Sequence, residues 1–311
     1  GVIATRFFIP SVSRVVPANA APVQTISADQ WWRLLRLSLF AFMMGFVSAA
    51  YWIFAPDLVV NLGSMPSDAT AWLWLGVGIA GLGGAVVADA NGNVQVVWHA
   101  APLDAKRGED ARGVYVAKSS DHGKTFAREV SINPLPGTCG CCGLDAFLDR
   151  DGRLLTLYRG VRDAQRDMML LVGNQPAAAK SLVVGPWEIR TCPMSAATFA
   201  QTRGGIAGAW EAKGNIHLGW FGTGKPSVKN STLIHRQAHQ RHPSIAANAD
   251  GSMLVAWSEN TGWKKGGGLA WHIYDAEAKP TNQQGQRPHG VPKWSFTAAV
   301  AHPDGSFEIL H

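Results

Sequence analysis

The sequence predicts a mostly β protein, namely a β-propeller of about five blades preceded by one N-terminal transmembrane α-helix. Two observations support this fold class: an uncharged apolar stretch in the first third and a turn motif that recurs through the rest. Hydrophobic residues make up 47% of the 311-residue chain and charged residues 16%, which excludes a disordered protein. The expected regions are a cytoplasmic tail at 1–30, the helix at 31–56, a connector at 57–82 and the propeller at 83–311.

The transmembrane helix is expected where charged residues are missing. Between Arg36 and Asp57 lie 20 uncharged residues, about the length that crosses a ~30 Å hydrocarbon core. Aromatic residues flank both ends of the stretch, as in the interfacial belts of spanning helices. The alternatives are a buried helix of a soluble protein and a removable signal peptide, because Val47-Ser48-Ala49 resembles a cleavage site. We expect a retained anchor.

The flanking charges predict the orientation of this anchor. Four arginines precede the helix, and no Lys or Arg follows it until Lys106. The positive-inside rule then places the N-terminus in the cytoplasm and the propeller in the periplasm, with a single pass through a bacterial inner membrane. Residues 71–87 are also apolar, but their five glycines and the strand-like pattern that follows favour an interfacial segment over a second span.

A hairpin turn with glycine recurs five times in the rest of the chain. Each turn is an Asn-Gly, Asp-Gly or Lys-Gly pair between alternating apolar residues, which two-residue hairpins prefer. The turns lie at 91–92, 151–152, 213–214, 250–251 and 304–305, and an aromatic follows the first four glycines by six positions, at Trp98, Tyr158, Trp220 and Trp257. This repeat favours a propeller over a β-sandwich. The C-terminal half-blade, residues 297–311, needs a strand partner, for which residues 57–63 are a candidate.

The stretch SSDHGKTF (119–126) follows one predicted strand and contains five residues at fixed spacing. These are Ser119, Asp121, Gly123, Thr125 and Phe126. Asp, Ser and Thr side chains close tight turns by accepting and donating local hydrogen bonds, and Gly accepts a positive φ. The pattern resembles the Asp-box, S-x-D-x-G-x-T-[FW], of sialidase-like (BNR-repeat) β-propellers, and the resemblance covers residues 83–311. It implies a structural turn between outer strands, away from any catalytic face.

Sialidase activity would need residues that this sequence does not clearly provide. The resemblance implies three arginines that hold a carboxylate, a Tyr–Glu nucleophile pair and an Asp acid. The motif around the first arginine is matched only by Phe7-Phe8-Ile9-Pro10, which has Phe in place of Arg and precedes the predicted helix. Candidate arginines are Arg159, Arg162, Arg166, Arg190, Arg203, Arg236 and Arg241, and the chain has only four tyrosines. We therefore assign no catalytic residue.

Four cysteines, Cys139, Cys141, Cys142 and Cys192, form a second candidate site. Four thiols could ligate zinc or an iron–sulfur cluster, but adjacent cysteines seldom both bind one ion, and no two C-x-x-C motifs form a pair in this sequence. An even count in an exported domain favours two disulfides. The CGCC…CPM pattern also resembles that of bacterial Asp-box proteins of unassigned function. Cys192 would pair with one cysteine of the cluster, and the local bridge would be Cys139–Cys142 or Cys139–Cys141, with no metal.

A basic loop precedes the fourth repeat. It contains His235, Arg236, His239 and Arg241, in the sequence IHRQAHQRHP. His235 and His239 have a zinc-like spacing for a helix, but no helix is expected before His242-Pro243. We interpret the segment as a solvated loop and a possible contact surface.

The anchor and the propeller together predict a non-catalytic accessory subunit. Its exported propeller would dock on or cap a larger integral membrane complex, such as a respiratory or photosynthetic assembly, with membrane subunits and lipid as partners. A net charge of +6 without a basic run argues against nucleic acid, and we expect no small-molecule substrate or cofactor. The alternative is a membrane-tethered sialidase-like glycoside hydrolase or glycan-binding lectin. Three arginines converging on the propeller axis beside a Tyr–Glu pair would favour that alternative.

Overall fold

The computed structural model describes residues 12–15, 32, 84–102, 105, 108–133, 136–176, 178–221, 228–232, 238–262, 264–293 and 295–311. The described chain is mostly β, and its strands all belong to one unit. In these residues no helix is both long and apolar enough to cross a membrane. The predicted helix at 31–56 lies outside the described residues apart from Trp32, and so does the predicted connector.

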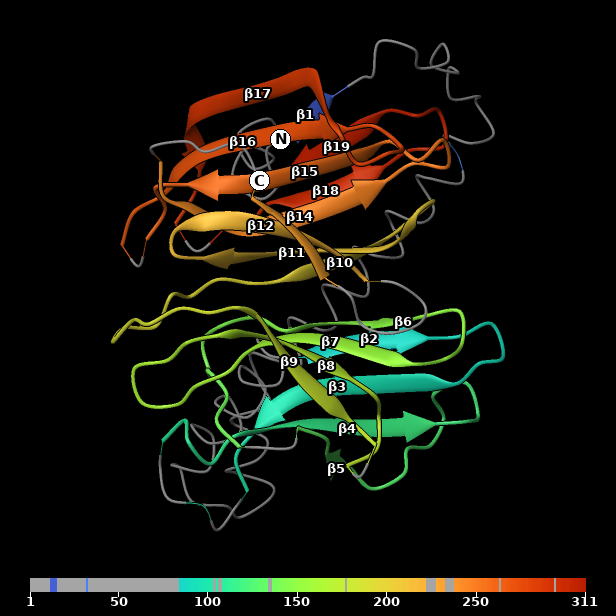
Figure 1. Cartoon of the computed structure of the whole chain (residues 1–311). Helices are drawn as coiled ribbons and strands as arrows, with labels where there is room; N and C mark the ends of the chain where they lie inside the picture. Colours follow the sequence, from blue (N-terminus) through green and yellow to red (C-terminus); the bar gives the residue numbers. More distant parts are fainter. Residues whose placement is uncertain are drawn as a thin grey trace. The chain divides into compact units, whose positions relative to one another are not determined.

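Nineteen strands form five antiparallel sheets in this part of the chain (Figure 1). The first sheet contains β2 (Gly84–Ala88), β3 (Val94–Ala100), β4 (Gly113–Ser119) and β5 (Val130–Ser131), and the second β6 (Asp145–Leu148), β7 (Leu154–Arg159), β8 (Met168–Val172) and β9 (Lys180–Gly185). The third contains β10 (Thr198–Thr202), β11 (Gly205–Ala212), β12 (Asn215–Phe221) and β13 (Val228–Thr232), and the fourth β14 (Gln240–Ala247), β15 (Met253–Glu259), β16 (Gly267–Tyr274) and β17 (Pro280–Val291). The fifth contains β18 (Ala298–Ala301), β19 (Phe307–Leu310) and β1 (Val12–Val15).

Each four-stranded sheet is a simple meander, and successive sheets pack face to face. The first strands β2, β6, β10, β14 and β18 lie next to one another in that order. A separate apolar core fills each space between successive sheets, centred on Leu154, Trp210, Trp257 and Phe307. Consecutive meanders with adjacent first strands are the arrangement of propeller blades. The number of blades in the whole chain stays a prediction, because most of residues 16–83 lie outside the described ones.

The repeated turns have the conformation that their sequence predicts. The glycines at 92, 152, 214, 251 and 305 all have φ between +72° and +94°. Four of these turns join the first two strands of a sheet, but Gly214 joins β11 to β12, the second and third strands. In the third repeat, the turn that the sequence pattern indicates is therefore the second hairpin of its sheet and not the first. Its first hairpin is Thr202-Arg203-Gly204-Gly205, and Trp210, not Trp220, is the fully buried aromatic six positions after Gly204.

The strand that completes the last sheet comes from the N-terminal tail. Val12–Val15 pair with Phe307–Leu310 in an antiparallel ladder, whereas residues 57–63, the candidate from the sequence, lie outside the described residues. An odd number of membrane crossings between residues 15 and 84 would put these two strands on opposite sides of the membrane. The β1–β19 pair is therefore compatible only with zero or an even number of membrane crossings between residues 15 and 84. Residues 84–87 of the second apolar stretch lie in β2.

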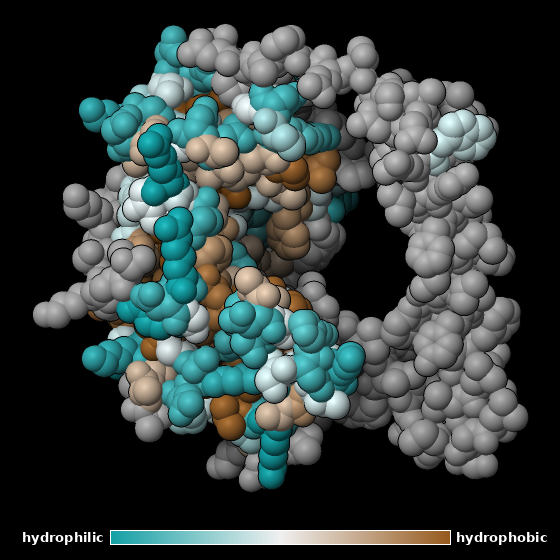
Figure 2. Space-filling view, turned by 90° about the vertical axis from the view of Figure 1, so that its right-hand side faces the viewer, coloured by the Kyte–Doolittle hydropathy of each residue, from teal (hydrophilic) through white to brown (hydrophobic). Residues whose placement is uncertain are grey.

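Some apolar side chains on the first and last sheets are not covered. Val86 on β2 is 69% exposed, and Val300 on β18 is 38% exposed. Figure 2 shows one face of the molecule, on which hydrophobic residues appear in the hollows between hydrophilic ones. The four inter-sheet cores thus account for most, but not all, of the apolar surface that the strands present.

Candidate functional site

The four cysteines lie in two loops that connect successive sheets. Cys139, Cys141 and Cys142 lie between β5 and β6, and Cys192 lies between β9 and β10. The first loop is anchored to the end of β7, because the Cys139 N–H donates to the Arg159 carbonyl at 2.9 Å and Thr138 bridges to Gly160. His99, at the end of β3, contacts the Cys142 carbonyl at 3.2 Å. The main chain of the cysteine loop is thereby held against the first two sheets.

The four sulfur atoms converge on one small volume. All of them lie within 4.8 Å of one another. Cys141 and Cys192 form a disulfide, whereas Cys139 and Cys142 are free thiols. The structure therefore holds one bridge to Cys192, as the sequence predicts, and does not close the second bridge that was expected between the remaining cysteines.

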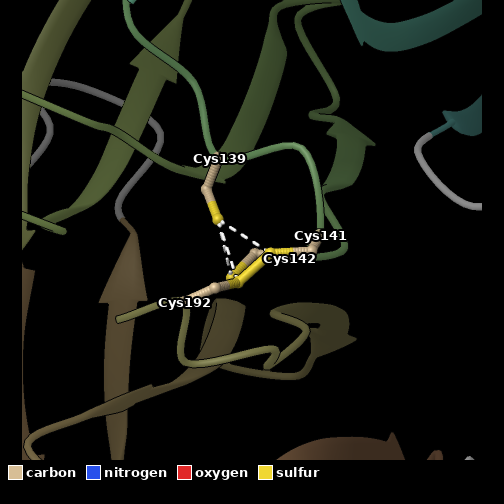
Figure 3. A group of neighbouring side chains, drawn as sticks. All are labelled: Cys139, Cys141, Cys142 and Cys192. Carbon is tan, nitrogen blue, oxygen red and sulfur yellow. Dashed lines mark hydrogen bonds between the residues drawn. A yellow bond between two sulfur atoms is a disulfide. The ribbon is translucent and has the colours of Figure 1, made fainter. Parts of the chain in front are cut away.

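Cys139 has an unusual relation to the disulfide (Figure 3). Its Sγ lies 3.4 Å from the Sγ of Cys192 and 3.5 Å from that of Cys141, and also 3.4 Å from the Sγ of Cys142. The two nearly equal distances to the bonded sulfurs place Cys139 beside the middle of the S–S bond, not on its axis. Thiol–disulfide exchange requires an attack aligned with the bond that breaks. Cys139 is therefore poorly placed to exchange with this disulfide.

The four cysteines differ in exposure. Cys139 and Cys142 are 0% and 2% exposed, whereas Cys141 is exposed and Cys192 is half-buried. The two disulfide-bonded residues are therefore more accessible than the two free thiols.

Charged side chains form a frame around the cysteines. Glu109 accepts a hydrogen bond from the Gly140 N–H at 2.9 Å and forms a short ion pair with Arg166. Burial raises the pKa of Glu109, but the bonds from Arg166 and Gly140 outweigh it, so that its pKa lies below its usual value. Arg112 lies directly over Gly140, since a Cβ there would be 1.3 Å from its Nη1. Glycine at 140 is therefore required for Arg112 to lie against the cysteine loop.

Two buried charges meet on the inner side of the cluster. Arg159 is 1% exposed and donates to the main-chain carbonyls of Arg166 and Glu211 at 3.0 and 2.8 Å, and its carbon Cζ lies 5.3 Å from the ring centre of Trp187. Its Nε has no hydrogen-bond partner, and neither has either carboxylate oxygen of Glu211. Buried polar atoms without partners are uncommon in proteins and mark places where another group can bind.

These surroundings change the acidities of the buried groups. The bond from the Cys139 thiol, with the Arg159 charge, lowers the pKa of Cys142 against the effect of burial, while the same bond and burial raise the pKa of Cys139. Burial raises the pKa of Glu211 to about 7, although Ser195, Arg159 and Arg241 partly offset it. Within the pair, the surroundings favour the thiolate form at Cys142 and disfavour it at Cys139, and burial favours the uncharged form of Glu211.

The basic loop contributes to the same region. His239 Nδ1 and Arg241 Nε lie 3.8 and 3.9 Å from Glu211 Oε1, and His235 and Arg236 lie outside the described residues. His242 is buried, its Nδ1 has no partner, and burial with the Arg241 charge lowers its pKa to about 4. The main-chain N–H of His242 donates a hydrogen bond to Ser195 Oγ at 3.4 Å. The two described residues of this predicted contact loop therefore lie beside a buried carboxyl group.

The Asp-box residues lie elsewhere, in the turn between β4 and β5. Asp121 accepts bonds from Ser119 Oγ (2.6 Å), the Thr125 N–H (2.9 Å) and Thr125 Oγ1 (2.6 Å), and the Gly123 N–H donates to Ser119 Oγ at 2.9 Å. These bonds hold the pKa of Asp121 well below its usual value. Phe126 does not pack onto a core but is 44% exposed. No reacting group lies among these turn contacts.

The arrangement implied by the sialidase resemblance is not assembled by the described residues. Arg159 and Arg166 are already engaged with main-chain carbonyls and with Glu109. The described tyrosines have other neighbours: Tyr115 stacks on Trp98, Tyr158 is buried in the core between the first two sheets, and Tyr274 lies against His272. A cavity of about 290 Å³ does contain Tyr158, Arg162 and Asp167, but only one arginine and no glutamate line it.

The sequence alone could not reveal the charged frame. Glu109, Arg159 and Glu211 come from three different sheets or their loops, and nothing in their spacing indicates that they meet. A weak signal was available at Glu211, a charged residue within the apolar strand GIAGAWEA. Buried charges of this kind are rare unless they are paired or bind a ligand.

Comparisons with known proteins do not identify a family. No protein-family model matches the chain, and no curated protein matches it. Solved structures with similar folds include an α-L-arabinanase from Penicillium chrysogenum (11% identity, TM-score 0.48, 73% of this chain and 74% of that chain) and an α-L-arabinofuranosidase from Fusarium graminearum (10%, 0.48, 71% and 71%). A protein of unknown function from Dyadobacter fermentans aligns at 13% identity with a TM-score of 0.46, over 73% of this chain and 75% of that chain. Neither of the two named enzymes is a sialidase, and at these scores the likenesses carry no argument about function.

Proposed function

We propose that the protein is a metal-binding β-propeller in which the four cysteines, once reduced, hold one divalent soft ion of the zinc class. The observation that carries this proposal is the convergence of four sulfur atoms within 4.8 Å. In a tetrahedral site with Zn–S bonds of about 2.3 Å, neighbouring sulfurs lie about 3.8 Å apart. The three contacts of Cys139, at 3.4–3.5 Å, are close to that spacing.

The charges around the cluster suit a divalent ion. Four thiolates with one divalent cation carry a net charge of −2, which needs compensation in a buried site. Arg166 is neutralised by Glu109, so that Arg112 over Gly140 and Arg159 beside Cys142 remain as two positive charges. Arg159 Nε, which has no partner among the described residues, is available to a thiolate. The ligands and the compensating charges agree with the requirements for a metal site.

A closed site with four protein ligands is structural, not catalytic, because it leaves no open position for substrate. Here the ion would cross-link the two loops that join the first sheet to the second and the second to the third. Such a propeller would present rigid loops for binding, in agreement with a non-hydrolytic role. No observation on the described residues favours the hydrolase alternative over this one.

The test is a metal titration of the fully reduced protein without oxygen. One Zn²⁺ per chain, bound with loss of all four reactive thiols, is the expected result. Cys139→Ala, which removes the sulfur nearest to the other three, should lower the Zn²⁺ affinity at least 100-fold. Asp121→Asn, in the Asp-box turn, is the matched control and should not change it. No uptake by the reduced wild-type protein would exclude the proposed function.

The membrane tether, its integral membrane partners and the periplasmic location are further proposals, supported only by the sequence of residues 31–56. The β1–β19 pair restricts them, because the tail and the propeller must then lie on the same side of a membrane. Cysteine labelling at residue 11 and at residue 250 in intact and lysed cells tests this. Labelling of both sites from the same side is expected, and labelling from opposite sides would contradict the strand pair.

A further inference from the structure

We infer that the Cys141–Cys192 disulfide is a redox gate on the metal site, so that disulfide and metal ion are alternative cross-links between the same two loops. This inference rests on the proposed function. Two of the four ligands are consumed by the disulfide, which leaves Cys139 and Cys142 as the only free thiols of the cluster. A site with four thiolates forms only after that bond is reduced.

The exposure of the four cysteines divides them into two pairs with different roles. Cys139 and Cys142 are buried and stay in place as a resident pair of ligands. The disulfide that acts as the gate joins the two more accessible cysteines, because Cys141 is exposed and Cys192 is half-buried. A reductant can therefore reach the disulfide without unfolding the loop, while the resident thiols are shielded from it.

Cys139 explains why the disulfide can persist beside two free thiols. It lies beside the middle of the S–S bond, at 3.4 and 3.5 Å from its two sulfurs, and not in line with it. Exchange with Cys139 is therefore disfavoured, and we infer that the gate responds to an external dithiol. The same position becomes favourable once the bond is reduced, because Cys139 then lies close to both new thiolates and to Cys142 at 3.4 Å.

The redox step balances with a dithiol protein or small dithiol as the reductant. One thiolate of the reductant attacks the exposed Cys141 sulfur, the S–S bond breaks, and Cys192 leaves as a thiolate. The second thiol of the reductant then attacks its own partner sulfur, which releases Cys141 and leaves the reductant as a disulfide. The ion binds the four thiolates and displaces the remaining thiol protons, including that of Cys139. A disulfide oxidant reverses the reaction after the ion has been lost.

The charged side chains around the cysteines can keep their contacts in both the disulfide-bonded and the metal-bound form. Arg112 lies against Gly140, between the first two cysteines, and Glu109 holds the Gly140 N–H whichever bond is present. The Cys139 N–H bond to Arg159 likewise does not involve a sulfur. The loop can thus keep its conformation while the cross-link changes from a covalent bond to an ion.

The experiment equilibrates the full chain in dithiol–disulfide buffers of graded potential with excess Zn²⁺, and measures bound zinc and free thiols in each sample. Zinc content should rise from below 0.1 to about one per chain in the same range in which the thiols, counted after denaturation and removal of the metal, rise from two to four. Zinc bound equally at all potentials would overturn the gate and leave the metal site intact. No zinc even at the most reducing potential would overturn the proposed function itself.

Two variants separate the roles of the pairs. Cys139→Ala keeps the disulfide but lacks one resident ligand, so its reduction should release two thiols with at least 100-fold weaker zinc binding. Cys192→Ser cannot form the Cys141–Cys192 disulfide. Its remaining three thiols should bind zinc more weakly, and this binding should not depend on the potential as long as those thiols stay reduced. A potential-dependent step of wild-type size in Cys192→Ser would show that another cysteine pair is the gate.

Discussion

The Asp-box turn and the cysteine cluster are both rich in polar groups, but they differ in how those groups are satisfied. In the turn, both oxygens of Asp121 accept hydrogen bonds from residues within four positions, and the bonds from Thr125 lie at the surface. In the cluster, Arg159 Nε and both oxygens of Glu211 are buried without a hydrogen-bond partner. A polar group that is satisfied locally builds a fold, whereas one that is buried and unsatisfied leaves room for a ligand.

The largest expected effect concerns the metal. Removal of a resident sulfur in Cys142→Ala should reduce Zn²⁺ uptake by the reduced protein from about one per chain to below 0.1 at micromolar zinc, because only three of the four positions of the tetrahedral site then have a sulfur ligand. Inductively coupled plasma mass spectrometry after gel filtration measures it. Ser119→Ala, which changes the turn, should retain full uptake. An equal loss of Zn²⁺ uptake in Cys142→Ala and Ser119→Ala would contradict the claim that the cysteine cluster, and not the Asp-box turn, binds the ion.

The second effect concerns the cross-link between the loops. The disulfide closes a loop of 51 residues, and its reduction without metal should lower the free energy of unfolding by about 4 kcal/mol through chain entropy. Zinc should restore most of this loss in the reduced protein. Urea unfolding of the oxidised, reduced and reduced zinc-loaded forms measures the three values. A reduced form as stable as the oxidised one would show that the loops do not need a cross-link.

The third effect is a pH dependence that arises at Glu211. Burial raises its pKa to about 7 from 4.5, so the folded chain binds this proton more tightly than the unfolded chain. Stability is therefore greatest below about pH 4.5 and falls as the pH rises to about 7, by about 3 kcal/mol at most. Glu211→Gln should flatten this part of the profile in oxidised, metal-free protein. Glu277→Gln, on an exposed turn, should leave the slope unchanged.

The smallest effect lies in the Asp-box turn. Asp121→Ala removes the acceptor of three local bonds at an exposed site and should lower the melting temperature by a few degrees only. Zinc stoichiometry and the redox midpoint should stay as in the wild type. A change in either would show that the turn and the cluster are coupled, although they occupy different loops.

The repeat shows how far the sequence could predict the fold. Gly92, Gly152, Gly251 and Gly305 were correctly placed at first hairpins, because such turns depend on local conformation. Gly214 was assigned to the wrong hairpin, since Thr202–Gly205 lacks an Asn-Gly or Asp-Gly pair and the next hairpin has a favoured turn. The spacing from Gly204 to Trp210 repeats the pattern of the other sheets. Whether Val12–Val15 or another segment pairs with β19 is a long-range choice that local preferences do not decide.

The cysteine cluster shows which features could not be predicted from local sequence patterns. The rule that adjacent cysteines seldom share one ion argued against a metal, yet the sulfurs of Cys141 and Cys142 both lie within 4.8 Å of the other two. A Cβ at Gly140 would collide with Arg112 in its present position, and one at Gly143 would lie 3.2 Å from the Cβ of Ala196, so both glycines favour this tight loop. Such contacts between different sheets are absent from any sequence window. The sequence predicts two disulfides, whereas the structure closes only Cys141–Cys192 and leaves Cys139 and Cys142 as free thiols.

X-ray absorption at the zinc edge of the reduced, zinc-loaded protein tests the central claim most directly. The account predicts a single shell of four sulfur atoms at about 2.3 Å from the ion. Nitrogen or oxygen ligands at about 2.0–2.1 Å, or fewer than four sulfurs, would contradict a site formed by Cys139, Cys141, Cys142 and Cys192.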